Sequence, residues 1–282
     1  MQEPDGADGL AETIRGGETV GMLQGEGIQS NQPHALVAEA DMACRMGLQH
    51  LFSVILELPV RAFADCESVM AQLRDGVRPR VVVVGVPRPA TGALTLIREA
   101  KMRGACVMAL DWQRGTEDAV QAFLAGADDV ARAPVRLKEL ALRMQARLGA
   151  ELSGLQSCRL DFSADWEAEA DIALRAGLTE AEARVVRVLI GRDGHIVTRD
   201  ELSQAIDRRP WDYGDRKFDV HVAKIRKKLH RVFGSQISVR TVRSSGYLMT
   251  VADAAVAVNA TPGMTGGEGP GLVRPLLRRS VK

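Results

Sequence analysis

The sequence predicts two domains of different class: an α/β domain with a doubly wound, five-stranded parallel sheet, and a smaller α+β domain of helices closed by a β-hairpin. The first is predicted by short apolar runs that alternate with helix-length amphipathic stretches between residues 33 and 150. The second is predicted by two helix-capping patterns, a basic amphipathic helix and two strand-like runs between residues 171 and 251. With 282 residues, of which 46% are hydrophobic, the chain can build both cores.

The α/β domain is predicted to contain five β–α units. The expected strands are Ala35–Ala38, Val60–Ala64, Val81–Val86, Cys106–Leu110 and Asp128–Ala131. The expected helices are Asp41–Leu56, Cys66–Asp75, Ala93–Met102, Glu117–Leu124 and Leu137–Leu148. Because the central strands are continuously apolar, we expect a parallel sheet that helices cover on both faces. Any site should then lie at the carboxyl ends of the strands.

In the α+β domain, helix starts are marked by capping boxes. Thr179 precedes Glu182 by three residues, and Thr198 precedes Glu201 by three, so each pair can cap a helix. A loop, Asp207–Gly214, separates the second helix from the basic one. Strands are then expected at Gln236–Val242 and Tyr247–Val251. Three helices followed by such a hairpin form a winged helix-turn-helix.

The basic helix is expected over Asp215–Arg231. Phe218, Val222, Ile225 and Leu229 recur at the spacing of one buried stripe, while seven Lys or Arg and two Asp occupy the remaining surface. Between residues 178 and 250 there are fifteen Lys and Arg against nine Asp and Glu, although the whole chain has a net charge of only +1. Such a helix can lie in a DNA major groove. The charge pattern alone favours a solvated basic surface helix, and the DNA-binding interpretation depends on the capping boxes before this helix and the strands after it.

The remaining segments are read from composition. Residues 1–32 are expected to be a flexible arm, residues 151–170 a linker that runs into a small antiparallel platform, and residues 252–282 a disordered tail. Four widely spaced cysteines, Cys44, Cys66, Cys106 and Cys158, predict reduced, mostly buried thiols and no zinc site. No signal peptide or membrane-length apolar run is visible, so we expect a cytoplasmic protein without cofactor or bound metal.

The α/β domain resembles the receiver domain of bacterial two-component response regulators. The likeness rests on Glu39-Ala40-Asp41 after the first strand, on Gly126-Ala127-Asp128-Asp129 and on Pro134. The resemblance implies phosphoryl transfer to a strand-end Asp with Mg²⁺, a Lys and a Ser or Thr. This sequence has Gly85 at the acceptor position, and Ala40, Asp111 and Ala133 at the second acid, the hydroxyl and the lysine.

These departures predict a pseudo-receiver, because nucleophile, half the metal site and the phosphate's cation are all missing. A new acid/base pair of Glu39 and Asp111 is the alternative, but we expect two solvated carboxylates at a disused crevice because no nucleophile or metal ligand accompanies them. The resemblance also implies a phosphate-independent dimer, with Asp129, Glu139 and Arg143 at matching charged positions of the interface. The alternative is a monomer in which these charges are ordinary surface.

The α+β domain resembles the DNA-binding domain of OmpR/PhoB-type transcription regulators. The likeness rests on Phe218–Val222, Ile225–Leu229 and Thr241-Val242-Arg243-x-x-Gly246-Tyr247, with Ser244 in place of a usual wing glycine. It implies DNA contacts in the major groove, at the wing and along the backbone, from Arg216, Lys217, Val220, His221, Lys224, Lys228, Thr241, Arg243 and Tyr247. It also implies an RNA polymerase contact loop containing Arg208, Arg209, Trp211 and Tyr213.

The sequence thus predicts a sequence-specific, DNA-binding transcription regulator, with double-stranded DNA as partner and no enzymatic activity. Its control is expected not to run through aspartyl phosphorylation. Three alternatives remain: an adaptor that docks through the pseudo-receiver, a regulator switched by a non-phosphate ligand, and a phosphate-switched regulator with a relocated acceptor. Gly85 and Ala133 disfavour the last.

Overall fold

The computed structural model describes residues 32–112, 116–148, 160–192 and 194–252. The predicted flexible arm up to residue 31, the first part of the linker up to residue 159, the C-terminal tail from residue 253 and Cys158 lie outside the described residues. Within the described part of the chain, no helix is both long and apolar enough to span a membrane.

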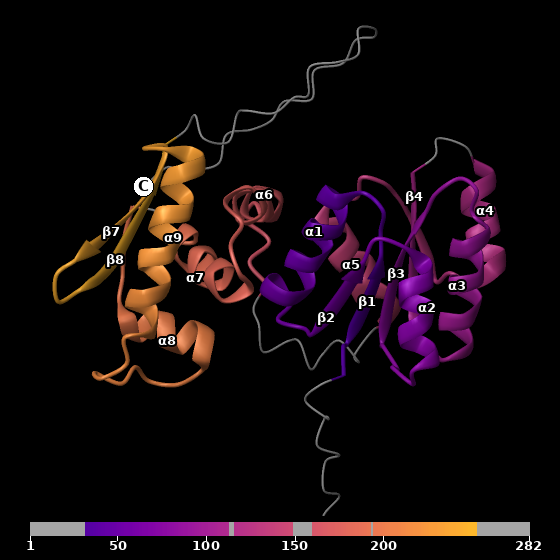
Figure 1. The fold of residues 1–282 in the computed structure, drawn as a ribbon, viewed down its shortest axis with the longest axis horizontal. Coiled ribbons are helices and arrows are strands. Elements are labelled where there is room, and N and C mark those ends of the chain that lie inside the picture. Colours follow the sequence, from indigo (N-terminus) through magenta and orange to yellow (C-terminus); the bar gives the residue numbers. More distant parts are fainter. Residues whose placement is uncertain (1–31, 113–115, 149–159, 193, 253–282) are drawn as a thin grey trace, which may run out of the picture. The chain divides into compact units, whose positions relative to one another are not determined.

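The first domain is built on a five-stranded parallel sheet in the order β2-β1-β3-β4-β5 (Figure 1). The strands are β1 (Ala35–Ala38), β2 (Val60–Phe63), β3 (Val81–Val86), β4 (Cys106–Asp111) and β5 (Asp129–Arg132). All four pairings are parallel, and every residue of the three central strands is buried. The predicted doubly wound fold is confirmed, and the strand order is the flavodoxin-like order expected for a receiver-like sheet.

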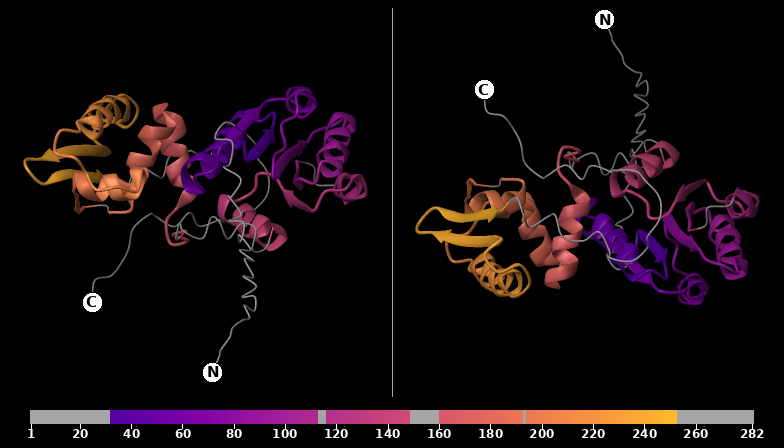
Figure 2. Two further views of the ribbon diagram at one scale, coloured as in Figure 1. Left: turned by 90° about the horizontal axis from the view of Figure 1, so that it is seen from below. Right: turned by 90° about the horizontal axis from the view of Figure 1, so that it is seen from above.

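Helices cover both faces of this sheet (Figures 1 and 2). They are α1 (Met42–His50), α2 (Cys66–Arg74), α3 (Thr91–Met102), α4 (Thr116–Ala125) and α5 (Leu137–Leu148). One core cluster includes Leu48 of α1 and Leu140 of α5, and the other includes Leu73 of α2 and Leu96 of α3. The predicted first helix continues past α1 as a π-helical turn, η1 (Leu51–Ile55), whose five residues are all buried.

The predicted antiparallel platform is wrong for the described residues before 171, because they contain a helix. This helix, α6 (Trp166–Ala176), begins at Asp165, whose carboxylate accepts from the backbone N–H of Ala168, and ends at Gly177 in the left-handed conformation. Its residues enter both cores: Trp166 belongs to the cluster around Leu140, whereas Ile172 belongs to the cluster of the second domain. The predicted domain boundary at residue 170 therefore falls inside a helix.

The second domain has the predicted helices and hairpin. Its elements are α7 (Glu180–Ile190), β6 (Ile196–Val197), α8 (Arg199–Asp207), α9 (Lys217–Phe233), β7 (Ile237–Val242) and β8 (Gly246–Val251). Both capping boxes form as predicted, at Thr179 and Thr198. The sequence did not predict β6, which pairs antiparallel with β8 and gives the sheet order β6-β8-β7. The topology is a winged helix-turn-helix.

The three described cysteines are unpaired thiols. Cys106 is buried, and Cys44 and Cys66 are half-buried. Burial raises the pKa of the Cys44 thiol to about 12, and the neighbouring carboxylates of Glu39 and Asp41 add to this shift. These thiols are therefore not poised as thiolate nucleophiles.

Candidate nucleic-acid interface

Helix α9 has one face in the core of the second domain. Phe218, Val222, Ile225 and Leu229 are almost fully buried, as their spacing predicted. They pack with the hairpin, where Val239 and Met249 belong to the same cluster. The opposite side of the helix is therefore held at the surface in a fixed rotation.

The fully exposed side of α9 is narrower than the sequence predicted. Lys217 forms an ion pair with Asp207. The ammonium of Lys228 lies 2.6 Å from the Glu182 carboxylate and 2.8 Å from the Gly177 carbonyl oxygen. These lysines occupy a flank of the helix and have partners within the domain.

His221 lies on the same flank as those two lysines. It is half-buried, and its Nδ1 is buried without a hydrogen-bond partner among the described residues. Placing this ring at a DNA surface would therefore require its other edge to face outward.

The side directly opposite the core carries an exposed stripe. Val220, Lys224, Lys227 and Arg231 are exposed at helical spacing, and Arg216 is exposed immediately before the helix starts. Of these residues, Arg216, Val220 and Lys224 were predicted DNA contacts, whereas Lys227 and Arg231 were not. Both could have been found by projecting α9 away from its buried stripe, because they lie three and seven residues beyond Lys224.

The hairpin carries a second set of exposed cations. Arg243 lies in the exposed turn between β7 and β8, and Arg240 is exposed on β7. Ser244 adopts a positive φ of 57°, so a serine here takes the conformation that favours glycine. At Gly246, an added Cβ would meet the Val197 carbonyl oxygen at 2.1 Å, so only glycine allows β6 to approach. The turn thus presents Arg243 at the tip of the wing.

The side chain of Thr241 is connected to α9. Arg226 donates from Nε to the Val239 carbonyl oxygen at 2.8 Å and from its terminal nitrogen to Thr241 Oγ1 at 3.1 Å. The Arg226 guanidinium therefore joins α9 to β7. Thr241 remains exposed beside it.

Tyr247 lies in the interior of the domain. Its side chain is fully buried, and its hydroxyl donates to Asp219 Oδ1, which also accepts from Arg199 at 2.6 Å. The Arg199 guanidinium stacks 4.9 Å from the Tyr247 ring centre. Burial raises the pKa of Tyr247, and the hydrogen bond from Arg199 lowers the pKa of Asp219. This cluster ties α8, α9 and β8 together.

The loop before α9 is partly packed. Trp211 donates from its indole to the Asp215 carbonyl oxygen at 3.1 Å and packs against the core. Arg208 and Arg209 form ion pairs with Glu57 and Asp215. Tyr213 is 90% exposed, although its ring contacts Trp211.

The strand ends of the first domain hold the degenerate acceptor position. Gly85 lies in β3, Asp111 ends β4, and Glu39 follows β1. The expectation that Glu39 and Asp111 are solvated is wrong: they are only 2% and 3% exposed. Glu39 is buried because its side chain lies over Gly85 instead of extending into solvent.

The three predicted interface charges pair with each other within one chain. Arg143 bonds Glu139 at 2.8 Å and Asp129 at 3.3 Å, and Arg147 adds a second contact to Asp129 at 3.4 Å. Nearby elements carry exposed apolar side chains instead: Val120, Phe123 and Leu124 on α4, and Leu142 on α5.

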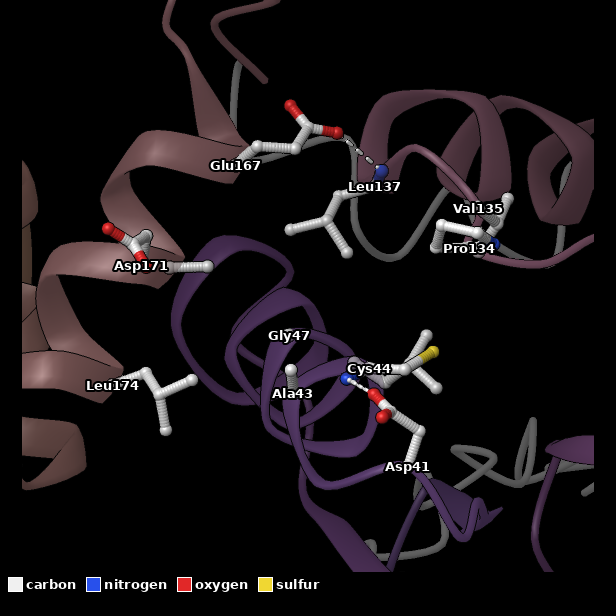
Figure 3. Close-up of a pocket in the computed structure, with 12 residues that line it drawn as sticks. Asp41, Ala43, Cys44, Gly47, Pro134, Val135, Leu137, Glu167, Asp171 and Leu174 are labelled. Carbon is white, nitrogen blue, oxygen red and sulfur yellow. Dashed lines mark hydrogen bonds between the residues drawn. The ribbon is translucent and has the colours of Figure 1, made fainter. Parts of the chain in front are cut away.

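A pocket of about 250 Å³ lies among α1, the turn before α5 and α6 (Figure 3). Its carboxylates already have structural partners. Asp41 accepts from the backbone N–H of Cys44 at 2.7 Å, and Glu167 accepts from that of Leu137 at 2.7 Å, so each caps a helix. Asp171 pairs with Arg175. We assign no ligand to this pocket.

The second domain matches a known family. Residues 175–249 match the model described as "Transcriptional regulatory protein, C terminal". This match covers α7 through most of β8, including the exposed stripe and the wing. In its domain order the chain resembles an OmpR/PhoB-type response regulator.

Some relatives match this chain over nearly their whole length. The chain is 27% identical over 237 residues to protein PetR of Rhodobacter capsulatus, covering 79% of this chain and 98% of the relative. It is 28% identical over 238 residues to the transcriptional regulatory protein AruR of Pseudomonas aeruginosa, covering 78% and 97%. Among solved structures, the response regulator DrrB of Thermotoga maritima is 20% identical with a TM-score of 0.36, covering 78% of this chain and 99% of DrrB.

The named relatives include transcriptional regulators, and the family model that matches residues 175–249 is that of the C-terminal domain of such proteins.

Proposed function

We propose that this regulator binds specific double-stranded DNA sites in the cytoplasm through α9 and the β7–β8 wing, without control by aspartyl phosphorylation. The observation that carries the proposal is the exposed stripe on α9, which lies opposite the buried face and is followed by Arg243 at the wing tip. Cations on one outward face of a core-anchored helix can reach a major groove and its phosphates.

The stripe divides into two kinds of contact. Arg216 and Val220, with His221 on the flank beside them, lie at the start of α9, the part of a recognition helix that reads base edges. Lys224, Lys227 and Arg231 continue toward its end and are suited to phosphates. Arg243, with Thr241 and Arg240 beside it, would meet the minor groove and the backbone at the wing.

We infer that the other residues predicted to contact DNA instead stabilise the structure of this domain. Lys217 and Lys228 form ion pairs inside the domain, and the Tyr247 hydroxyl bonds Asp219. These groups hold the geometry of the helix and wing. They are not counted among the phosphate contacts in the test that follows.

Salt-dependent binding tests this division. The logarithm of the association constant should fall linearly with the logarithm of salt concentration, by about 0.9 for each phosphate contacted. Lys227→Ala and Arg231→Ala should each remove about one phosphate contact and so reduce the magnitude of the slope by about 0.9. Arg98→Ala, which removes an exposed cation of α3, is the matched control and should leave the slope unchanged. An unchanged slope in both α9 variants would contradict the proposal that α9 binds in the DNA major groove.

Phosphorylation independence is supported at the acceptor position. Gly85 has no side chain to phosphorylate, and the space above it holds the Glu39 carboxylate. Incubating the full chain with a small phosphodonor and Mg²⁺ should therefore yield no acyl phosphate by intact mass. Stoichiometric, hydroxylamine-labile phosphorylation would contradict the proposal.

We further propose a homodimer that forms through the apolar surface of Val120, Phe123 and Leu124 on α4. Three exposed apolar residues within five positions of one helix favour association, whereas the nearby charges are satisfied within one chain. Phe123→Asp should shift sedimentation toward monomer. Met102→Asp, at a more exposed apolar residue of α3, should not. A wild-type chain that sediments as a monomer at high concentration would remove the proposal.

Tyr213 is the residue of the α8–α9 loop best placed to contact RNA polymerase. Its ring is almost completely exposed, whereas Trp211 is packed and Arg209 is paired. Tyr213→Ala should reduce transcription from a regulated promoter while DNA affinity stays constant. Equal loss of both would place this residue at the DNA instead.

A further inference from the structure

The space above Gly85 is filled by the chain's own carboxylate. A Cβ built on Gly85 would lie 2.4 Å from Glu39 Oε2, 3.0 Å from Cδ and 3.3 Å from Oε1. The acceptor position of the resembled receivers thus faces an acidic group that comes from the end of β1. Because Glu39 is only 2% exposed, this group is enclosed by protein.

Directed hydrogen bonds hold the Glu39 carboxylate in place. Oε1 accepts from the backbone N–H of Asp41 at 2.8 Å, and Oε2 accepts from the indole of Trp112 at 3.0 Å. Arg45 donates to the backbone carbonyl oxygens of Glu39 and Ala40. Burial raises the pKa of Glu39, and the bonds from Trp112 and Asp41 oppose that rise. An apolar side chain would fill the same volume without desolvating a carboxylate, but it would accept neither bond.

The bond to Trp112 joins two strand ends. Trp112 directly follows β4, which ends at Asp111, and α4 begins only four residues later at Thr116. A second connection holds the start of α4, where Asp118 pairs with Arg88 of the loop after β3 at 2.9 Å. The carboxylate therefore ties the end of β1 to the end of β4, four residues before α4 begins.

We propose that Glu39 is a built-in anionic ligand of the degenerate receiver site. Its carboxylate occupies the space of an acceptor side chain and, through Trp112, fixes the end of β4, four residues before α4 begins. The position of α4, and with it the apolar surface of Val120, Phe123 and Leu124, is then set by a permanent intramolecular contact. This inference rests on the proposed phosphorylation independence and goes beyond it, because it identifies what occupies the space of the missing acceptor side chain.

Amide hydrogen exchange of the full chain tests the proposal, at concentrations where sedimentation shows a monomer. Glu39→Ala removes the carboxylate, and Trp112→Phe removes only the indole donor. Both should speed exchange in α4 by about ten- to a hundred-fold, the effect of losing one hydrogen bond to a charged group. Exchange in the β7–β8 hairpin is the internal reference. Glu67→Ala, at an exposed acid of α2, is the matched control and should change neither region.

Chemical rescue identifies the ligand chemistry. Sodium acetate, titrated against sodium chloride at equal ionic strength, should slow α4 exchange in Glu39→Ala, because acetate can enter the opened space and accept from Trp112. It should have no effect on Trp112→Phe. If Glu39→Ala does not fold, Glu39→Gln replaces it: the amide keeps the shape but has one acceptor oxygen for two donors, so α4 exchange should again rise.

Two results would overturn the inference. One is unchanged α4 exchange in folded Trp112→Phe, since the bond would then restrain nothing. The other is a folded Glu39→Ala variant whose α4 exchange does not respond to acetate. Neither depends on the phosphodonor assay, because phosphorylation of the wild-type chain would refute phosphorylation independence while leaving the exchange comparison to be judged separately.

Discussion

Adding a single methyl group at Gly85 perturbs the degenerate site most directly. The Gly85→Ala side chain would overlap Glu39 Oε2, and the backbone φ at this position is not in the left-handed region, so strain comes from the contact alone. Relief requires the carboxylate to move away from Trp112 or the Asp41 N–H. Overpacking a buried site costs about 1–3 kcal/mol, and loss of one hydrogen bond to a charged group adds a term of similar size. We expect a loss of about 2–4 kcal/mol.

Denaturant unfolding of the full chain measures this loss through the transition of the first domain. Gly92→Ala is the matched control: no atom lies within 4 Å of its added Cβ, so alanine in this α3 position should stabilise by up to about 1 kcal/mol. In the double variant with Glu39→Ala, the added methyl should become nearly neutral, which gives a coupling energy of about 2–4 kcal/mol. A Gly85→Ala variant as stable as wild type would show that the carboxylate moves freely and would refute the reasoning.

Three further predictions concern stability. Burial, with the nearby charge of Arg187, lowers the pKa of His50 from 6.5 to about 4. The free energy of unfolding should therefore fall by up to about 3 kcal/mol as pH drops from 6.5 to 4. Urea melts of His50→Gln should lack this pH-dependent loss. Lys228→Ala leaves the Glu182 carboxylate, which is 3% exposed, without its cation; it should lower the unfolding free energy by about 1–3 kcal/mol in urea melts without changing the salt slope of DNA binding, whereas a lowered slope with unchanged stability would make Lys228 a phosphate contact. Ser244→Gly removes a serine at positive φ. It should raise the free energy of unfolding by up to about 1 kcal/mol, measured as a higher melting temperature. A lower melting temperature would show that the serine side chain stabilises the turn.

Most of the fold was predictable because its signals are local. The continuously apolar runs at Val81–Val86 and Cys106–Leu110 are buried strands within one residue of their predicted ends. Capping boxes marked the starts of α7 and α8 because side chain and backbone satisfy each other within four residues. The helix α6 was missed because its apolar residues face two cores, so they give no single stripe.

The candidate DNA surface was only partly predictable, since a charge pattern does not tell which lysine has a partner. The partners of Lys217 and Lys228 are acids that are distant in sequence or lie on another helix, Asp207 and Glu182. The degenerate site shows a similar limit. Sequence predicted the missing acceptor at Gly85, but not that Glu39 would fill its space, which depends on the rotation of one side chain.

Genome-wide footprinting of the full-length regulator, with and without a phosphodonor, tests the central claim most directly. We predict discrete bound sites whose number and occupancy do not change with the phosphodonor and which disappear in the Lys224→Ala, Arg243→Ala double variant. Sites that appear only after phosphodonor treatment would contradict phosphorylation independence. Discrete sites that persist in the double variant would contradict recognition by α9 and the wing.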